Sequence, residues 1–226
     1  MFRKAIILGL ILPVAVFFLK LIAIGLANFQ PSEFKPVISI FLLDISASSR
    51  NLLQEEQNFI LRMAKRMDSE DHVRIYVVTE DAYEVYDGNP HKTSAMREAM
   101  NKRSAFDSQA YGTAYGTALK KAIDDALIYK AKGYTPAIIV LGDLENEGAV
   151  DKQINWNTLP KNIKNTLNYI PDLSLTFLFA DPQKLDEIRQ VLIPVFKEKD
   201  KTDSLIFASE ENTEQALRKF SRAVGR

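Results

Sequence analysis

Cysteine is absent from the 226-residue sequence, and histidine occurs only twice. The missing thiols exclude disulfide bonds, thiolate metal sites and cysteine nucleophiles, and they suit a compartment in which free thiols would oxidise. His72 and His91 have no partner at the spacing of a metal site, so we interpret both as solvated loop residues. These absences leave oxygen-bearing side chains as the candidates for metal binding.

An excess of charge of either sign is also missing. The chain has 29 basic and 29 acidic residues, a formal net charge of zero, and no long basic block, so nucleic acid is not an expected partner. Apolar residues make up 46% of the chain, which is ordinary for a globular protein. The length suits one domain with an appendage, or two small domains.

The N-terminal residues 1–29 have the character of a membrane segment. Residues 5–19 carry no charge, and the apolar run resumes after Lys20, so that the two parts together reach the length of about 20 residues that crosses a bilayer. We therefore expect a transmembrane anchor that contacts the membrane through residues 5–29. A cleaved signal peptide is the alternative, because Gly25 to Ala27 forms a small-x-small end. Residues 30–36, with two prolines, are expected to form a stiff linker.

The rest of the chain, residues 37–226, alternates short apolar runs with stretches of helical periodicity. The expected strands are 37–43, 73–79, 83–86, 137–141, 173–180 and 204–208. The expected helices are 52–67, 93–103, 114–132, 157–169, 183–192 and a last one capped by Asn212. This order predicts a doubly wound α/β fold, with a mostly parallel six-stranded sheet and helices on both faces. Strand 83–86 follows its neighbour too closely for a parallel crossover, so it is expected to be antiparallel, at an edge.

Three small oxygen-bearing side chains follow the first strand at alternate positions. They are Asp44, Ser46 and Ser48 in the stretch Asp44-Ile45-Ser46-Ala47-Ser48. Carboxylates and hydroxyls are hard donors that suit Mg²⁺, Ca²⁺ or Mn²⁺, and the spacing suits a loop that wraps one point in space. A strand cap followed by a turn into a helix uses the same residue types and is the alternative interpretation.

Two further segments are predicted to lie near this loop. Asp143 ends another continuous apolar strand, and a glycine-rich stretch from Gly112 to Leu119 precedes a long helix. Ligands of doubly wound sheets bind beyond the carboxyl ends of the strands, at the point where the strand order reverses. If the strands that end at Asp44 and Asp143 are neighbours, their carboxylates meet at that point.

In this combination the sequence resembles the von Willebrand factor type A domain, a family with a metal-ion-dependent adhesion site. The family's Asp-x-Ser-x-Ser motif matches Asp44, Ser46 and Ser48. Its Gly-Thr-x-x-Gly-x-Ala-Leu pattern is similar to Gly112–Leu119, which makes Thr113 the matching threonine. Asp143 matches the third element, although the chain has Gly142-Asp143-Leu144 where the family usually has Thr-Asp-Gly. The resemblance covers residues 37–226.

The resemblance implies a bound divalent cation, usually Mg²⁺. Ser46, Ser48 and Thr113 would be direct hydroxyl ligands, while Asp44 and Asp143 would hold water in the shell or bind directly. One coordination position would remain for an Asp or Glu side chain of a partner protein, as in a non-enzymatic, metal-dependent binding module. We also consider an aromatic rim of Tyr111, Tyr115 and Trp156, although ordinary packing is favoured for each of the three on its own. A Mg²⁺-dependent phosphohydrolase using Asp44 and a metal-independent scaffold are the alternative functions.

Arg3 and Lys4 precede the apolar run, so the positive-inside rule places the C-terminal domain outside the cytoplasm. Protease added to intact spheroplasts is therefore expected to digest residues 37–226. Full protection of these residues, or a mature N-terminus at Asn28, would contradict either the orientation or the uncleaved anchor.

Overall fold

The computed structural model describes residues 35–106, 112–145, 148–208 and 212–223. These belong to the compact unit that begins at Pro36, apart from Lys35. The expected membrane segment, residues 1–29, and most of the expected linker lie outside the described residues. In the described ranges, no helix has both the length and the apolar character needed to cross a membrane.

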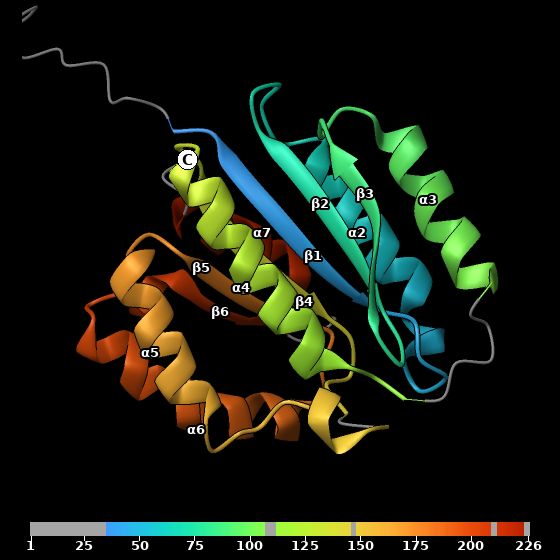
Figure 1. Cartoon of the computed structure of the whole chain (residues 1–226). Helices are drawn as coiled ribbons and strands as arrows, with labels where there is room; N and C mark the ends of the chain where they lie inside the picture. The colour runs from blue at the N-terminus through green and yellow to red at the C-terminus, as the bar shows by residue number, and fades with distance from the viewer. Residues whose placement is uncertain (1–34, 107–111, 146–147, 209–211, 224–226) are drawn as a thin grey trace, which may run out of the picture. The chain divides into compact units, whose positions relative to one another are not determined.

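The core of the unit is a six-stranded sheet in the order β3-β2-β1-β4-β5-β6 (Figure 1). The sheet is parallel except for β3, which pairs antiparallel with β2 at one edge, as predicted. The strands are β1 (Val37–Asp44), β2 (His72–Val78), β3 (Ala82–Gly88), β4 (Thr135–Leu141), β5 (Ser174–Leu178) and β6 (Leu205–Ala208).

Helices cover both faces of the sheet. The α-helices are α2 (Leu53–Ala64), α3 (Thr93–Phe106), α4 (Tyr115–Ala131), α5 (Leu159–Tyr169), α6 (Pro182–Glu198) and α7 (Thr213–Ala223). Short 3₁₀ turns η1 (Ser49–Asn51), η2 (Val150–Lys152) and η3 (Thr202–Ser204) lie in the connections. One apolar core joins the sheet to α4, α5 and α6, and the other joins it to α2, α3 and α7. Figure 1 shows α4 and α5 in front of the sheet and α2 and α7 behind it.

The two faces of β1 explain why this strand has a continuous apolar sequence. Ile38, Ile40 and Leu42 enter the core with α4, α5 and α6, whereas Phe41 and Leu43 enter the core with α2, α3 and α7. Side chains alternate along a strand, so a strand buried on both faces needs apolar residues at nearly every position. All eight residues of β1 are buried.

Strands β1 and β4 are neighbours, and the strand order reverses between them. Leu43 pairs with Leu141 at their carboxyl ends, so Asp44 and the residues after Leu141 lie at the same edge of the sheet. The structure thus confirms that the two strands are neighbours, which is the condition for Asp44 and Asp143 to come together.

Several element boundaries differ from the sequence-based expectations, and two of the differences have a clear reason. Helix α6 continues six residues past the expected end at Leu192 and contains Pro194, because Val195 and Phe196 beyond it are buried in the core. Strand β3 extends two residues past the expected strand 83–86, to Asp87 and Gly88. Asp87 pairs with Arg74 of β2 in the ladder register, and their side chains form an ion pair.

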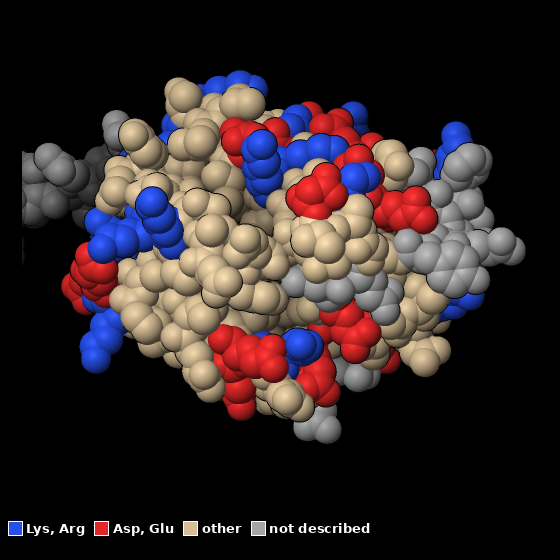
Figure 2. Space-filling view, turned by 60° about the horizontal axis from the view of Figure 1, so that its bottom comes forward, with Lys and Arg blue, Asp and Glu red and all other residues tan. Residues whose placement is uncertain are grey.

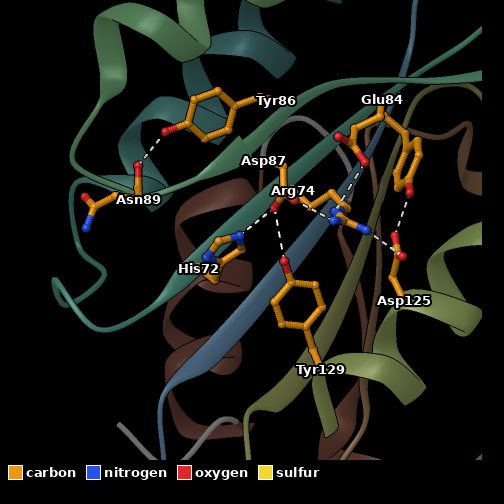
Figure 3. A network of polar contacts seen from close by, with 9 residues as sticks. His72, Arg74, Glu84, Tyr86, Asp87, Asn89, Asp125 and Tyr129 are labelled. Carbon is orange, nitrogen blue, oxygen red and sulfur yellow. Dashed lines mark hydrogen bonds and ion pairs between the residues drawn. The ribbon is translucent and has the colours of Figure 1, made fainter. Parts of the chain in front are cut away.

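The edge strand β3 is tied to the sheet and to α4 by a network of polar side chains (Figure 3). Arg74 is its centre: its guanidinium donates to Asp125 of α4 at 2.6 Å and to Asp87 of β3 at 2.5 Å. Tyr129 donates to Asp87, and Tyr76 donates to Asp125 at 2.6 Å. The network therefore joins three elements through one cation and its acceptors.

His72 also belongs to this network, which corrects its interpretation as a solvated loop residue. It is the first residue of β2, its Nε2 lies 2.5 Å from Asp87 Oδ1, and its ring contacts Tyr129. Burial acts to raise the pKa of Asp87. Hydrogen bonds from Arg74 and His72 outweigh burial and hold this pKa below its ordinary value.

Asp87→Asn is expected to lower the free energy of unfolding by about 1–2 kcal/mol at pH 7, because it removes charge-assisted hydrogen bonds from Arg74. A carboxyl with a lowered folded-state pKa stabilises the fold above its unfolded pKa and loses this contribution as the pH falls through the folded value. The difference in the free energy of unfolding between wild type and Asp87→Asn, measured with urea, should thus shrink below about pH 4. Asp124→Asn, at an exposed position of α4, is the control. A difference independent of pH would contradict the assigned role of the charge.

Candidate metal centre

Asp44 is the last residue of β1, and its side chain is fully buried. Its Oδ1 accepts a hydrogen bond from the backbone N–H of Ser46 at 2.8 Å. Its Oδ2 accepts from the hydroxyl of Ser49 at 2.8 Å and from the hydroxyl of Tyr115 at 2.7 Å. The carboxylate thus organises its own loop, the start of η1 and the start of α4.

The hydroxyls of Ser46 and Ser48 lie together, 3.1 Å apart. Ser46 is buried, whereas Ser48 is exposed, so the pair extends from the protein interior to the surface. The predicted convergence of alternate side chains is confirmed for these two residues. Two neighbouring hydroxyl oxygens offer lone pairs to one point near the surface, as a hard cation requires.

Ser49 connects the loop after β1 with the loop after β4. Its hydroxyl donates to Asp44 and accepts from the backbone N–H of Asp143 at 3.3 Å. Asp143 Oδ1 accepts from the backbone N–H of Glu145 at 2.9 Å, which fixes its side chain in the loop. Ser49 could not be recognised from the sequence, because one more serine beside Ser48 carries no pattern of its own.

The loop after β4 depends on a glycine at position 142 and on an unusual backbone conformation at Leu144. A Cβ at Gly142 would lie 2.2 Å from the hydroxyl of Tyr115 and 2.5 Å from Cβ of Asp44, so a larger residue would displace the carboxylate. Leu144 has φ of 63°, a conformation that glycine favours, at the position where the resembled family has glycine. The Leu144 side chain is 1% exposed, and this burial offsets the strain.

Tyr115 belongs to the core and not to an aromatic rim, in agreement with ordinary packing. It is 1% exposed, its hydroxyl donates to Asp44, and the same hydroxyl accepts from the backbone N–H of Leu144 at 3.3 Å. Trp156 is partly buried and packs against the same core. Tyr111 lies outside the described residues. The buried phenol satisfies its polar atom by holding two loops together.

Thr113 lies in the third converging segment, two residues before Tyr115. The backbone N–H of Ala114 donates to the carbonyl of Thr79 at 2.6 Å, which fixes this segment beside the end of β2. Thr113 is fully buried, yet its hydroxyl has no hydrogen-bond partner among the described residues. Buried hydroxyls normally have a partner, so this oxygen points to a group that the polypeptide does not supply.

Glu56 of α2 is a second buried group without a partner. It is fully buried, and neither carboxyl oxygen forms a hydrogen bond with a described residue. In the sequence it occupies a position of the apolar stripe of this helix, the one interruption in an otherwise apolar pattern. That interruption is the signal by which it could have been recognised.

The carboxyl groups at this end of the sheet repel one another. Burial raises the pKa of Asp44 to about 6, and the charge of Asp143 acts in the same direction, while the hydrogen bonds from Ser46, Tyr115 and Ser49 oppose the rise. A divalent cation would relieve this repulsion. The described residues contain no group of three or more His, Asp or Glu placed to hold a metal by themselves, so any such ion also needs the hydroxyls.

Figure 2 turns the lower part of the view in Figure 1 toward the viewer. Acidic and basic side chains are interspersed over this face, and neither sign forms an extended surface among the described residues. This distribution agrees with the expectation that nucleic acid is not a partner, which remains a prediction.

Residues 39–146 match the model of the von Willebrand factor type A domain family. The match covers just under half of the chain and includes all five predicted ligands, which are Asp44, Ser46, Ser48, Thr113 and Asp143. A search of curated proteins found no match.

Solved structures show the same fold. The protein BatB of Bacteroides thetaiotaomicron is 18% identical, with a TM-score of 0.55, over 84% of this chain and 100% of that one. An aerotolerance-related membrane protein of Bacteroides fragilis, with multiple mutations to serine, is 17% identical, with a TM-score of 0.56, over 83% and 98%. The VWA domain of SpRpn10 is 12% identical, with a TM-score of 0.54, over 77% and 87%.

Thr113→Val is expected to leave the melting temperature in EDTA unchanged or to raise it, because the lost hydroxyl has no partner among the described residues. Ser49→Ala removes a donor to buried Asp44 and is expected to cost about 1–3 kcal/mol under the same conditions. Thermal unfolding followed by circular dichroism compares the two variants. Equal destabilisation by both would mean that the Thr113 hydroxyl is bonded within the protein.

Proposed function

We propose that residues 37–226 form a von Willebrand factor type A domain that binds a divalent cation and uses it to recognise an acidic side chain of a partner protein. The ion is Mg²⁺ or, as substitutes of similar ligand preference, Mn²⁺ or Ca²⁺. The proposed ligands are Asp44, Ser46, Ser48, Thr113 and Asp143. The observation that carries the proposal is the buried Thr113 hydroxyl, which has no partner among the described residues although it lies within the family match.

The chemistry of the donors suits this role. The hydroxyls of Ser46, Ser48 and Thr113 are neutral, so as direct ligands they do little to offset a charge of +2. Asp44 uses both carboxyl oxygens for hydrogen bonds inside the protein, which favours contact with the ion through water. A cation held in this way keeps a high effective charge, and its free coordination position attracts a carboxylate from outside.

We further propose that the domain works at a membrane, outside the cytoplasm. The support is the apolar run in residues 5–29 with Arg3 and Lys4 before it. One of the similar structures is a protein described as an aerotolerance-related membrane protein. An exported binding domain tethered by a single segment would meet its partner at the membrane surface.

The structure disfavours the phosphohydrolase alternative. A nucleophilic carboxylate must present an oxygen to its substrate, but Asp44 is fully buried and both of its oxygens accept hydrogen bonds from within the protein. The metal-independent scaffold is a stronger rival, since three internal donors satisfy Asp44 without an ion. The buried Thr113 hydroxyl, which has no partner among the described residues, favours the cation over the scaffold.

Calorimetric titration of Mn²⁺ into the whole chain in mild detergent tests the site. Wild type is expected to bind one ion, whereas Thr113→Val and Asp143→Asn should each weaken binding by about 10-fold or more. Asp151→Asn, at an exposed position of η2, is the matched control and should bind as wild type does. Equal affinity in wild type and Thr113→Val would rule out the ligand assignment.

A small carboxylate tests the recognition chemistry. Binding of the two ligands is reciprocal, so sodium glutarate should raise the apparent affinity for Mn²⁺ relative to sodium chloride at the same ionic strength. No such increase is expected in Thr113→Val. An unchanged affinity in wild type would contradict the acidic partner, and turnover of p-nitrophenyl phosphate that depends on Mn²⁺ would restore the enzyme alternative.

A further inference from the structure

A groove lies between α4 and α5, two helices that cover the same face of the sheet (Figure 1). Its volume is about 600 Å³, which is within the range of ligand-binding pockets in proteins. The connection between η2 and α5 also lines it, from Asp151 to Asn155. The apolar residues of its lining are Leu119, Ile123, Ile154 and Leu159.

The groove begins next to the candidate metal centre. A Cβ at Gly116, in the first turn of α4, would lie 2.1 Å from the carbonyl oxygen of Gln153, so the connection crosses this helix in direct contact. The Gln153 side chain donates to the carbonyl of Gly148 at 3.0 Å. A Cβ at Gly148 would lie 3.6 Å from Cα of Gly112 and 4.0 Å from the backbone nitrogen of Thr113. A short series of contacts therefore connects the wall of the groove to the segment that carries the Thr113 hydroxyl.

Exposed apolar side chains continue the groove at its other end. Leu127 follows Ile123 by one turn of α4 and is 39% exposed. Tyr169 follows Asn165, a residue of the groove, by one turn of α5 and is 74% exposed. Residues four apart lie on the same side of a helix. Both helices return the chain to the start of a parallel strand and so run in the same direction, which places Leu127 and Tyr169 at the same end.

The chemistry of the lining indicates what the groove can bind. Of the described residues that line it, Lys120 and Asp151 carry a charge, one of each sign, so the groove favours neither an acidic nor a basic ligand. Asn162 and Asn165 present exposed carboxamides from α5. A carboxamide both donates and accepts hydrogen bonds, so it can pair with the main-chain N–H and C=O groups that an extended segment leaves free and a helix uses internally. The groove therefore fits an extended polypeptide segment with apolar side chains.

We propose that this groove binds the stretch of the partner protein next to the acidic residue that reaches the cation. The inference rests on the proposed function, since it describes the partner of the same site. The acidic side chain enters at the start of α4, and the neighbouring residues lie along the groove in an extended conformation, with apolar side chains toward Ile123 and Leu127. The ion then attracts the charge, while the groove discriminates among partners that all present an acidic residue.

Two pools of peptides test the proposal on the whole chain in mild detergent with Mn²⁺. Short fluorescein-labelled peptides carry one aspartate in the middle, flanked by random valine, leucine, isoleucine and phenylalanine in one pool and by random serine, threonine, glycine and glutamine in the other. Detergent without protein is the blank. Fluorescence anisotropy is expected to show about 10-fold or more tighter binding of the apolar pool to wild type.

A variant within the groove and a matched variant outside it locate the binding. Asn162→Arg places a long side chain in the groove and should remove the preference for the apolar pool. Asn168→Arg makes the same change at an exposed position of the same helix that does not line the groove, and it should keep the preference. Thermal melts check that both variants are folded.

The outcomes separate this inference from the function on which it rests. Equal affinity of wild type for the two pools, or an unchanged preference in Asn162→Arg, would overturn this inference, while Mn²⁺ binding and its increase by glutarate would leave the proposed function intact. Binding of the apolar pool that persists in EDTA would separate the groove from the ion and overturn the inference as well. A dimer of wild type and a monomer of Asn162→Arg in analytical ultracentrifugation would assign the groove to a second copy of this chain instead. If wild type binds no Mn²⁺, the proposed function itself fails.

Discussion

The buried carboxylate of Asp44 is the constraint on which this end of the molecule depends. It lies at the end of the central strand β1, where burial disfavours its charge, and three donors from two different segments compensate for this. Because those donors are the Ser46 backbone, Ser49 and Tyr115, satisfying one charge also fixes the loop into η1 and the start of α4. Neutralising Asp44 would thus affect loops that are far apart in the sequence.

The Asp44 carboxylate also limits which residues can occupy the loop after β4. Gly142 must lack a side chain because Asp44 and Tyr115 occupy the space where a Cβ would be. The chain then needs a left-handed conformation at Leu144, and the burial of that side chain offsets the strain. The family's usual residues differ from those of this loop. This chain has glycine before the aspartate and a buried leucine after it.

The sheet and the meeting of its loops could be predicted from the sequence, because strands β1 and β4 are continuous apolar runs that each lead into an aspartate. Rules for parallel sheets then place both aspartates at one edge. The roles of Tyr115, Ser49 and His72 could not be predicted in the same way. Each is decided by a contact with another segment of the chain: Tyr115 with Asp44, Ser49 with the backbone of Asp143, and His72 with Asp87. A local pattern contains no information about such a contact, and so an aromatic rim was considered for Tyr115 and His72 was assigned to a loop.

The polar groups of the site fall into two classes that bear on its chemistry. Asp44 is satisfied by the protein alone, so the fold can form around it without an ion. Thr113 is equally buried, but its hydroxyl has no partner among the described residues, so the free-energy cost of the site falls on this side chain. A ligand that satisfies the hydroxyl recovers that cost on binding and stabilises the folded state by linkage, by about 2.7 kcal/mol at a concentration 100 times its dissociation constant. Under the proposed function the cation is that ligand, and an outside carboxylate then contributes only the last coordination position.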